Sequence, residues 1–456
     1  MVFKLRDYND FFLCVKDGAS ITMRIFEEVE KMRKTLVGLL LALASCAVPI
    51  TLVRAAEEPK PPATEQKPAE PAEKPLEPGW LSLDSTVGVA DNWIALNKSA
   101  LQDAIGINIS GFFDSAYNWS SNHPGNPRNI SGRIFNKDYN QIQFNNFNLT
   151  LDKPEKDWGV GIHVSGMFGR EGALLRESTL WGTSLHAVEP SAELFESYIT
   201  TTIPFGEGIQ FKGGLFVTPL GAEIISQPGS YNYNITNSFN FFYGIPFRHL
   251  GGLFTYPFLK TLSVTGGLVT GWDNPRDNNG SPSFLGNVNF TPTDAFQFAS
   301  SIVVGPEQTR NTHNMRTAWS NVATIKPMDP LTVYLEYTFG TEHQAPTPTG
   351  NRNAQWYNFA GVGSWDWTDR FNTSLRGEVF LDQGASRTLG FAATKPITNV
   401  SLGEFTLTAT YKFTKMLLGR AEVRQDFANR PVFQRGSGGN ADSNQTTMAV
   451  QMLYQY

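Results

Sequence analysis

Cysteine is almost missing from this chain of 456 residues. The two cysteines, Cys14 and Cys46, both lie near the N-terminus. Their absence from the rest of the chain excludes a disulfide framework, a cysteine-ligated zinc site, c-type haem attachment and cysteine catalysis there. Charged residues are also sparse, at 17% of the chain, where soluble domains have about 25%. The net charge of −5 offers no basic footprint for nucleic acid.

Long apolar runs are nearly absent as well. A helical membrane protein would show several runs of about 20 apolar residues, and only 36–53 comes near that length. Helical periodicity is scarce after residue 105, which argues against a soluble enzyme of several domains. No nucleophile elbow, zinc-protease motif or phosphate-binding loop accompanies the six histidines. We therefore expect neither an enzyme nor a bound cofactor or metal.

The N-terminus carries an export signal. A short basic segment at 32–34 is followed by the apolar run 36–44 and by a small-residue cleavage site that ends at Ala55. Residues 32–55 are therefore predicted to be a signal peptide that the mature protein lacks. Residues 1–31 carry mixed charge and make a poor signal start. We interpret them as an over-extended start, with a genuine N-terminal extension as the alternative.

Two further segments precede the patterned part of the chain. Residues 56–79 alternate Pro, Glu, Lys and Ala and are predicted to be an extended periplasmic linker. Residues 80–104 form a transition segment to which we assign no role. Cys46 ends a stretch that also resembles a lipoprotein box, and as the alternative it would be lipidated and begin the mature protein. The apolar residues that follow Cys46 favour cleavage after Ala55.

The body of the chain alternates apolar and polar residues with a period of two. Phe113 and Tyr117 fall on one face of the first such segment, and Asp114 and Asn118 fall on the other. Seven tight turns plus a first and a last strand give about 16 strands, an even number, as bacterial single-chain barrels have. We predict an all-β fold over 105–456, a transmembrane, antiparallel, up-and-down β-barrel.

Short and long connections follow each other in strict alternation, which predicts short periplasmic turns at one end and long extracellular loops at the other. The turns are predicted at 152–157, 204–207, 258–260, 291–294, 326–330, 368–369 and 414–415. The long connections are predicted at 120–140, 169–191, 219–247, 273–283, 305–313, 341–354, 383–402 and 428–445.

The last strand ends on an aromatic residue. Apolar residues occupy every second position up to Tyr454 and Tyr456. This ending resembles the signal read by the β-barrel assembly machinery of the outer membrane. Together with the export signal, it predicts that the protein lies in outer-membrane lipid of a Gram-negative-type bacterium.

Four runs carry a family resemblance. They are GINISGFFD at 106–114, LFESY at 194–198, FKGGLFVTPLG at 211–221 and YGIPFRHLG at 243–251. These runs resemble the OmpL-like family of β-barrel porins over about residues 100–456. The resemblance implies an outer-membrane pore. The substrates of that family are poorly defined, so no selectivity carries over.

A barrel of about 16 strands is wide enough for an aqueous channel, so its inward positions should be polar. The predicted pore-lining residues on strands are Glu336, Arg376, Glu378, Lys412, Arg420, Glu422, Arg424 and Asp426. Opposed rows of these charges would make a transverse field that orients solutes. The alternative is that they are simply solvated and neutralise one another. On the first interpretation, neutralising Arg420 and Arg424 shifts ion selectivity toward cations.

The connection 219–247 is the longest and holds the predicted constriction residues Glu223, Tyr231, Tyr233 and Asn237. In sixteen-stranded porins the third loop folds inward and narrows the pore, and this connection occupies that place. Its Asn and Tyr content suits weak stacking contact with polar solutes such as sugars. An extracellular cap is the alternative.

These features predict a porin for passive diffusion of small hydrophilic solutes, with a structural or adhesion barrel of the outer membrane as the alternative. The solute, the ion preference and the oligomeric state, for which a homotrimer is one candidate, stay open. We also expect that Val379→Arg or Leu407→Arg on the lipid face destabilises the barrel far more than Arg376→Ala in the lumen, because polar change is tolerated there.

Overall fold

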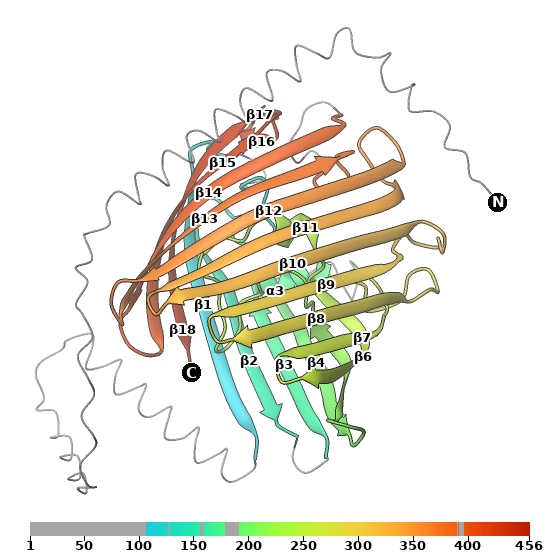
Figure 1. The fold of residues 1–456 in the computed structure, drawn as a ribbon. Coiled ribbons are helices and arrows are strands. Elements are labelled where there is room, and N and C mark those ends of the chain that lie inside the picture. The colour runs from blue at the N-terminus through green and yellow to red at the C-terminus, as the bar shows by residue number, and fades with distance from the viewer. Residues whose placement is uncertain (1–105, 126–127, 156–158, 178–190, 390, 392–395) are drawn as a thin grey trace, which may run out of the picture. The chain divides into compact units, whose positions relative to one another are not determined.

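The computed structural model describes residues 106–456 apart from 126–127, 156–158, 178–190, 390 and 392–395. In this part of the chain, 16 antiparallel strands form one closed barrel (Figure 1). The barrel closes where β1 (Asn108–Ser120) pairs with β18 (Asn444–Gln455). The predicted fold class is confirmed. The predicted signal peptide, linker and transition segment, and the cleavage site at Ala55, lie outside the described residues.

The strands follow the chain around the barrel, except that β15 pairs with β18. The other barrel strands are β2 (Gln141–Lys153), β3 (Gly161–Gly169), β4 (Ser191–Ile203), β5 (Ile209–Val217), β6 (Arg248–Leu259), β7 (Leu262–Val269), β8 (Ser283–Thr293), β9 (Phe296–Pro306), β10 (Met315–Met328), β11 (Leu331–Ala345), β12 (Arg352–Asp366), β13 (Phe371–Gln383), β14 (Asn399–Lys412) and β15 (Leu417–Ala428). The long connections contain α3 (Arg170–Glu177), the π-helical turn η1 (Asn240–Gly244) and a hairpin of β16 (Phe433–Arg435) and β17 (Asn440–Asp442).

The six tight turns predicted from 204–207 onward each lie between the two strands that the sequence places on either side. The turn predicted at 152–157 lies partly outside the described residues. Two long connections are shorter than predicted, because β11 continues to Ala345, β12 begins at Arg352 and β14 begins at Asn399. Backbone pairing continues there past the apolar band, as in the pair formed by Glu342 and Ala354. The alternation that marks a lipid-facing strand stops earlier than the hydrogen bonds do. The helix α3 and the β16–β17 hairpin were not predicted.

The strand residues that were predicted to face outward and inward do so in the structure. On β13, Val379 is 44% exposed, whereas Arg376 is 1% exposed. Leu407 on β14 is 54% exposed. An apolar outer face with polar inner positions is what lipid requires of a barrel strand. Among the described residues, no helix is long and apolar enough to span a membrane.

Candidate functional site

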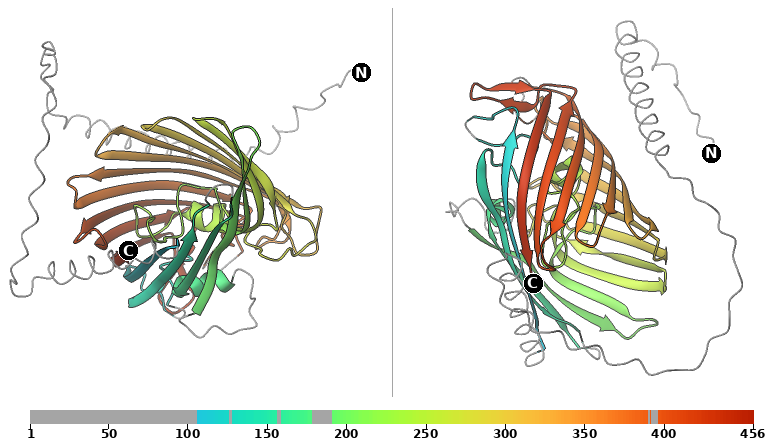
Figure 2. Two further views of the ribbon diagram at one scale, coloured as in Figure 1. Left: turned by 90° about the horizontal axis from the view of Figure 1, so that it is seen from below. Right: turned by 90° about the vertical axis from the view of Figure 1, so that its left-hand side faces the viewer.

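The third loop, residues 218–247 between β5 and β6, lies inside the ring of strands (Figure 2, left). Its side chains and backbone bond to strands on the far wall. The Asn234 Nδ2 donates to Thr408 Oγ1 at 2.8 Å, and the Asn240 Nδ2 donates to Glu336 Oε1 at 2.7 Å. The Trp356 indole N–H donates to the carbonyl of Gly244 at 2.9 Å. The loop is therefore not an extracellular cap.

Acidic groups of the wall satisfy the backbone N–H groups of this loop. The Glu378 carboxylate accepts hydrogen bonds from the backbone N–H of Phe239 at 2.6 Å and of Asn240 at 2.7 Å. The Glu422 carboxylate accepts from the N–H groups of Ile235 at 2.6 Å and Thr236 at 3.2 Å. A buried loop has no sheet or helix to pair these donors, so each needs another acceptor. The carboxylates supply it.

Basic groups of the wall satisfy the carbonyls of the same loop. Arg420 donates to the carbonyls of Asn232 at 2.8 Å and Tyr233 at 2.6 Å. Arg424 donates to the carbonyl of Asn237 at 2.6 Å. Arg376 donates to the carbonyl of Thr236 at 2.7 Å. We call this set, Glu336, Arg376, Glu378, Arg420, Glu422 and Arg424, the loop clamp.

Further ion pairs hold the clamp itself. Arg376 bridges Glu223 on the third loop and Glu404 on β14. Arg424 pairs with Asp426 on its own strand, with 2.6 Å between Nε and Oδ1. Glu404 is not among the predicted pore-lining residues, although it occupies an inward position of β14 opposite Glu378. It is the acid on which Arg376 and Arg424 converge.

The prediction that the charged residues of the wall face water in the lumen is therefore wrong for most of them. Because the third loop covers the wall, seven of them are buried rather than solvated: Glu336, Arg376, Glu378, Arg420, Glu422, Arg424 and Asp426. Asn237 on the loop is buried too. Lys412, Glu223, Tyr231 and Tyr233 remain partly exposed. Neutralising Arg420 and Arg424 should consequently loosen the loop as well as alter the field.

Apolar side chains fill the end of the lumen near the long loops. We call this cluster the aromatic plug. Its loop members are Phe135, Ile225, Phe239, Phe241, Phe242, Ile245, Phe247, Val432 and Phe433, and its wall members include Phe195, Phe216, Leu253, Val269, Leu285, Val303, Trp356, Phe380 and Leu402. The wall members come from strands on both sides of the barrel. Burying each large side chain contributes about 1.5–3 kcal/mol. Apolar packing in the plug thus helps the polar contacts of the loop clamp to hold the third loop inside the lumen.

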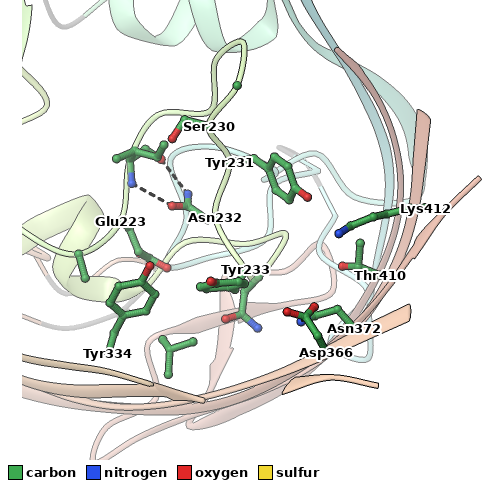
Figure 3. A pocket seen from close by; sticks show the side chains of 15 residues that line it. Glu223, Ser230, Tyr231, Asn232, Tyr233, Tyr334, Asp366, Asn372, Thr410 and Lys412 are labelled. Carbon is green, nitrogen blue, oxygen red and sulfur yellow. Dashed lines mark hydrogen bonds between the residues drawn. The ribbon is translucent and has the colours of Figure 1, made fainter. Parts of the chain in front are cut away.

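The order of features along β13 shows how the lumen is divided. From the turn end to the loop end, Asn372 lines a cavity, Arg376 and Glu378 belong to the clamp, and Phe380 belongs to the plug. The cavity at the turn end has a volume of about 510 Å³ (Figure 3). A second cavity of about 480 Å³ lies at the loop end, between the first loop, Tyr243 and the β16–β17 region.

The seam of the barrel involves the predicted assembly signal. Tyr454 pairs with Phe113 on β1 and with Leu417 on β15. The backbone of Tyr456 exchanges two hydrogen bonds with Gly111, at 3.0 and 3.1 Å. The last residues therefore close the ladder at the turn end. Their role as a signal for the assembly machinery stays a prediction.

The histidines near the lumen have structural partners. The His249 Nδ1 bonds the carbonyl of Gly271 at 3.0 Å, and its Nε2 bonds Thr218 Oγ1 at 3.1 Å. His163 stacks on Tyr198 and lies 3.1 Å from an Asp152 oxygen. Within the described ranges, no group of three or more His, Cys, Asp or Glu could hold a metal ion.

Asp273 fixes the point at which the third loop returns to β6. Its carboxylate accepts from the backbone N–H groups of Phe247 at 2.6 Å and Arg248 at 2.9 Å. Burial raises the pKa of Asp273 to about 6, despite these hydrogen bonds. The folded-state pKa lies above the ordinary value of 3.8. The group therefore favours folding below about pH 4, and that contribution is lost as the pH rises through about 6.

This shift predicts the behaviour of Asp273→Asn, which keeps an acceptor but carries no charge. Its melting temperature should exceed that of the unmodified protein at about pH 8, and the two should converge near pH 4. Thermal unfolding of the detergent-solubilised barrel across this range measures the difference. A difference in melting temperature that grows toward low pH would contradict burial as the cause of the raised pKa of Asp273.

A closed 16-stranded barrel with an inward third loop defines the class of outer-membrane porins. The chain belongs to the family described as "Putative beta-barrel porin-2, OmpL-like", whose model matches residues 106–456. It is thus a porin-type protein of the outer membrane, as the sequence resemblance implied.

Solved structures share the fold. The outer-membrane channel DcaP of Acinetobacter baumannii superposes with a TM-score of 0.51 at 10% identity, covering 77% of this chain and 97% of that one. An anion-selective porin from Comamonas acidovorans gives a TM-score of 0.51 at 9% identity, covering 77% and 99%. A search of curated proteins finds no significant match. At this level of identity, the likeness concerns the fold alone.

Proposed function

We propose that this porin is a gated diffusion channel for small hydrophilic solutes, in which the third loop sets the narrowest section. The observation that carries the proposal is the loop clamp, by which Arg420, Glu422 and Glu378 hold the loop across the lumen. Side chains of the same loop form part of the plug, which closes the loop end of the lumen. Conduction then needs the third loop, together with its own plug residues, to move away from the plug residues of the wall.

The long loops face the outside and the turns face the periplasm in this proposal, as in outer-membrane barrels. The export signal at 32–55 with cleavage after Ala55 remains part of it, and N-terminal sequencing of outer-membrane material should begin at Ala56 or Glu57. A lipid-modified Cys46 would overturn that cleavage site but not the export. A homotrimer stays a prediction, which light scattering of the purified protein tests.

Planar-bilayer recording tests the function. The purified protein should give discrete conductance steps with brief openings, because the plug fills the loop end of the lumen. Phe241→Ala/Phe242→Ala should lengthen the openings, since both rings pack on Phe135 and on each other. A folded barrel without steps, both unmodified and with these substitutions, would instead support the structural or adhesion alternative.

A further inference from the structure

The turn-end cavity lies between the third loop and four neighbouring strands. Its loop side is formed by Tyr231 and Tyr233, and its wall side by Tyr334 on β11, Asp366 on β12 and Lys412 on β14. Figure 3 shows Tyr231 and Lys412 extending toward one another across it. Its volume of about 510 Å³ falls in the range of pockets that hold small ligands.

The tyrosines are held in place before any solute arrives. The Asn232 side chain accepts from the backbone N–H of Ile224 at 2.9 Å and donates to its carbonyl at 2.7 Å. Arg420 donates to the carbonyls of the consecutive residues Asn232 and Tyr233, and its guanidinium carbon lies 5.4 Å from the Tyr231 ring centroid. The rings of Tyr233 and Tyr334 lie 5.6 Å apart. A preorganised surface of this kind lowers the cost of binding.

The polar groups of the cavity combine donors and acceptors. Asp366 is exposed and accepts one hydrogen bond, from Asn372 Nδ2 at 2.9 Å. Within the described part of the chain, no hydrogen bond or ion pair engages the Lys412 ammonium. Three phenol groups add further donors and acceptors. Burial raises the pKa of Tyr231, so its hydroxyl keeps its proton.

The lining has no net positive charge that would hold an anion. Its one cation, Lys412, is matched by the acid Asp366, and its second acid, Glu223, is paired with Arg376 of the loop clamp. A solute with many hydroxyls can meet both kinds of polar group while its C–H faces lie on the tyrosine rings. We infer that this cavity is a binding subsite for neutral carbohydrates of about disaccharide size, on the periplasmic side of the plug. The inference deepens the proposed function and rests on it for the direction of the solute path.

Equilibrium dialysis with radiolabelled maltose tests the subsite. The full-length protein is held in micelles of an amine-oxide detergent, so that no sugar headgroup competes. Tyr231→Ala/Tyr233→Ala should raise the dissociation constant about tenfold, the effect of losing two stacking faces. Tyr231→Phe/Tyr233→Phe keeps both rings and should stay closer to the unmodified protein. Tyr139→Ala, in the first loop at the other end of the barrel, is the matched control and should change nothing.

Two results would overturn the subsite. One is equal maltose affinity in the alanine double variant and the unmodified protein, and the other is saturable binding of sodium succinate without binding of maltose. Because dialysis does not depend on conduction, the subsite and the channel can be rejected independently of one another. Conductance steps without maltose binding would reject the subsite and leave the channel. Maltose binding without conductance steps would reject the channel and leave the subsite.

Discussion

Removing the inner part of the third loop should widen the pore. Deleting residues 227–240 takes away the backbone groups that Glu378 and Glu422 hold and the Phe239 side chain in the plug. The strands on either side, β5 and β6, remain paired over Gln210–Val217 with Arg248–Thr255, so the barrel should still assemble. Single-channel conductance should rise several-fold, and liposomes should swell in larger sugars than before.

The matched control is a deletion of residues 348–350 at the tip of the connection between β11 and β12. This tip is largely exposed and lies outside the clamp and the plug. It should leave conductance and size cutoff unchanged. An assembled 227–240 deletion with the conductance of the unmodified protein would place the constriction elsewhere.

Arg376→Ala should destabilise the barrel as strongly as an arginine on the lipid face. The guanidinium is buried, and its loss removes the ion pair with Glu223 and leaves Glu404 only the longer contact with Arg424, at 3.8 Å. Removing one partner of a buried ion pair costs about 3–5 kcal/mol. Val379→Arg, at an exposed apolar position of the same strand, should cost about 2–4 kcal/mol. The sequence-based expectation of a small effect at Arg376 is thereby revised, because that expectation assumed a solvated side chain.

Urea unfolding in lipid bilayers measures both variants. Arg435→Ala is the control, since its ion pair with Asp442 is exposed and should contribute less than about 1 kcal/mol. Adding Glu404→Gln to Arg376→Ala should recover part of the loss, because the double variant removes an uncompensated charge. If Arg376→Ala proves as mild as Arg435→Ala while Val379→Arg is severe, the lumen charges are solvated after all.

The barrel could be predicted from the sequence because lipid imposes a rule on every strand. An outward position must be apolar, so Val379 and Leu407 alternate with polar neighbours and fix the phase. The tight turns can be recognised by their Pro and Asp residues, as at 291–294 and 326–330. Both signals are local, and a single strand with its turn is enough to show them.

The clamp and the plug could not be predicted in the same way, because they depend on contacts between distant parts of the chain. Glu378 accepts hydrogen bonds from residues about 139 positions earlier in the chain. The assumption that inward positions are polar also fails at Phe380 and Trp356, which are buried in the plug. These two side chains do carry a signal. A large apolar residue at an inward position of a barrel strand indicates that something packs against it inside the lumen.

The inward placement of the third loop can be measured by a cross-link. Asn234 and Thr408 form a side-chain hydrogen bond of 2.8 Å between the loop and β14. In Asn234→Cys/Thr408→Cys, a short bifunctional thiol reagent should join the two positions in the folded, membrane-inserted protein and hold the channel closed until the link is cleaved. Failure to cross-link, together with rapid labelling at position 234 by a membrane-impermeant maleimide from outside, would contradict a third loop clamped within the lumen.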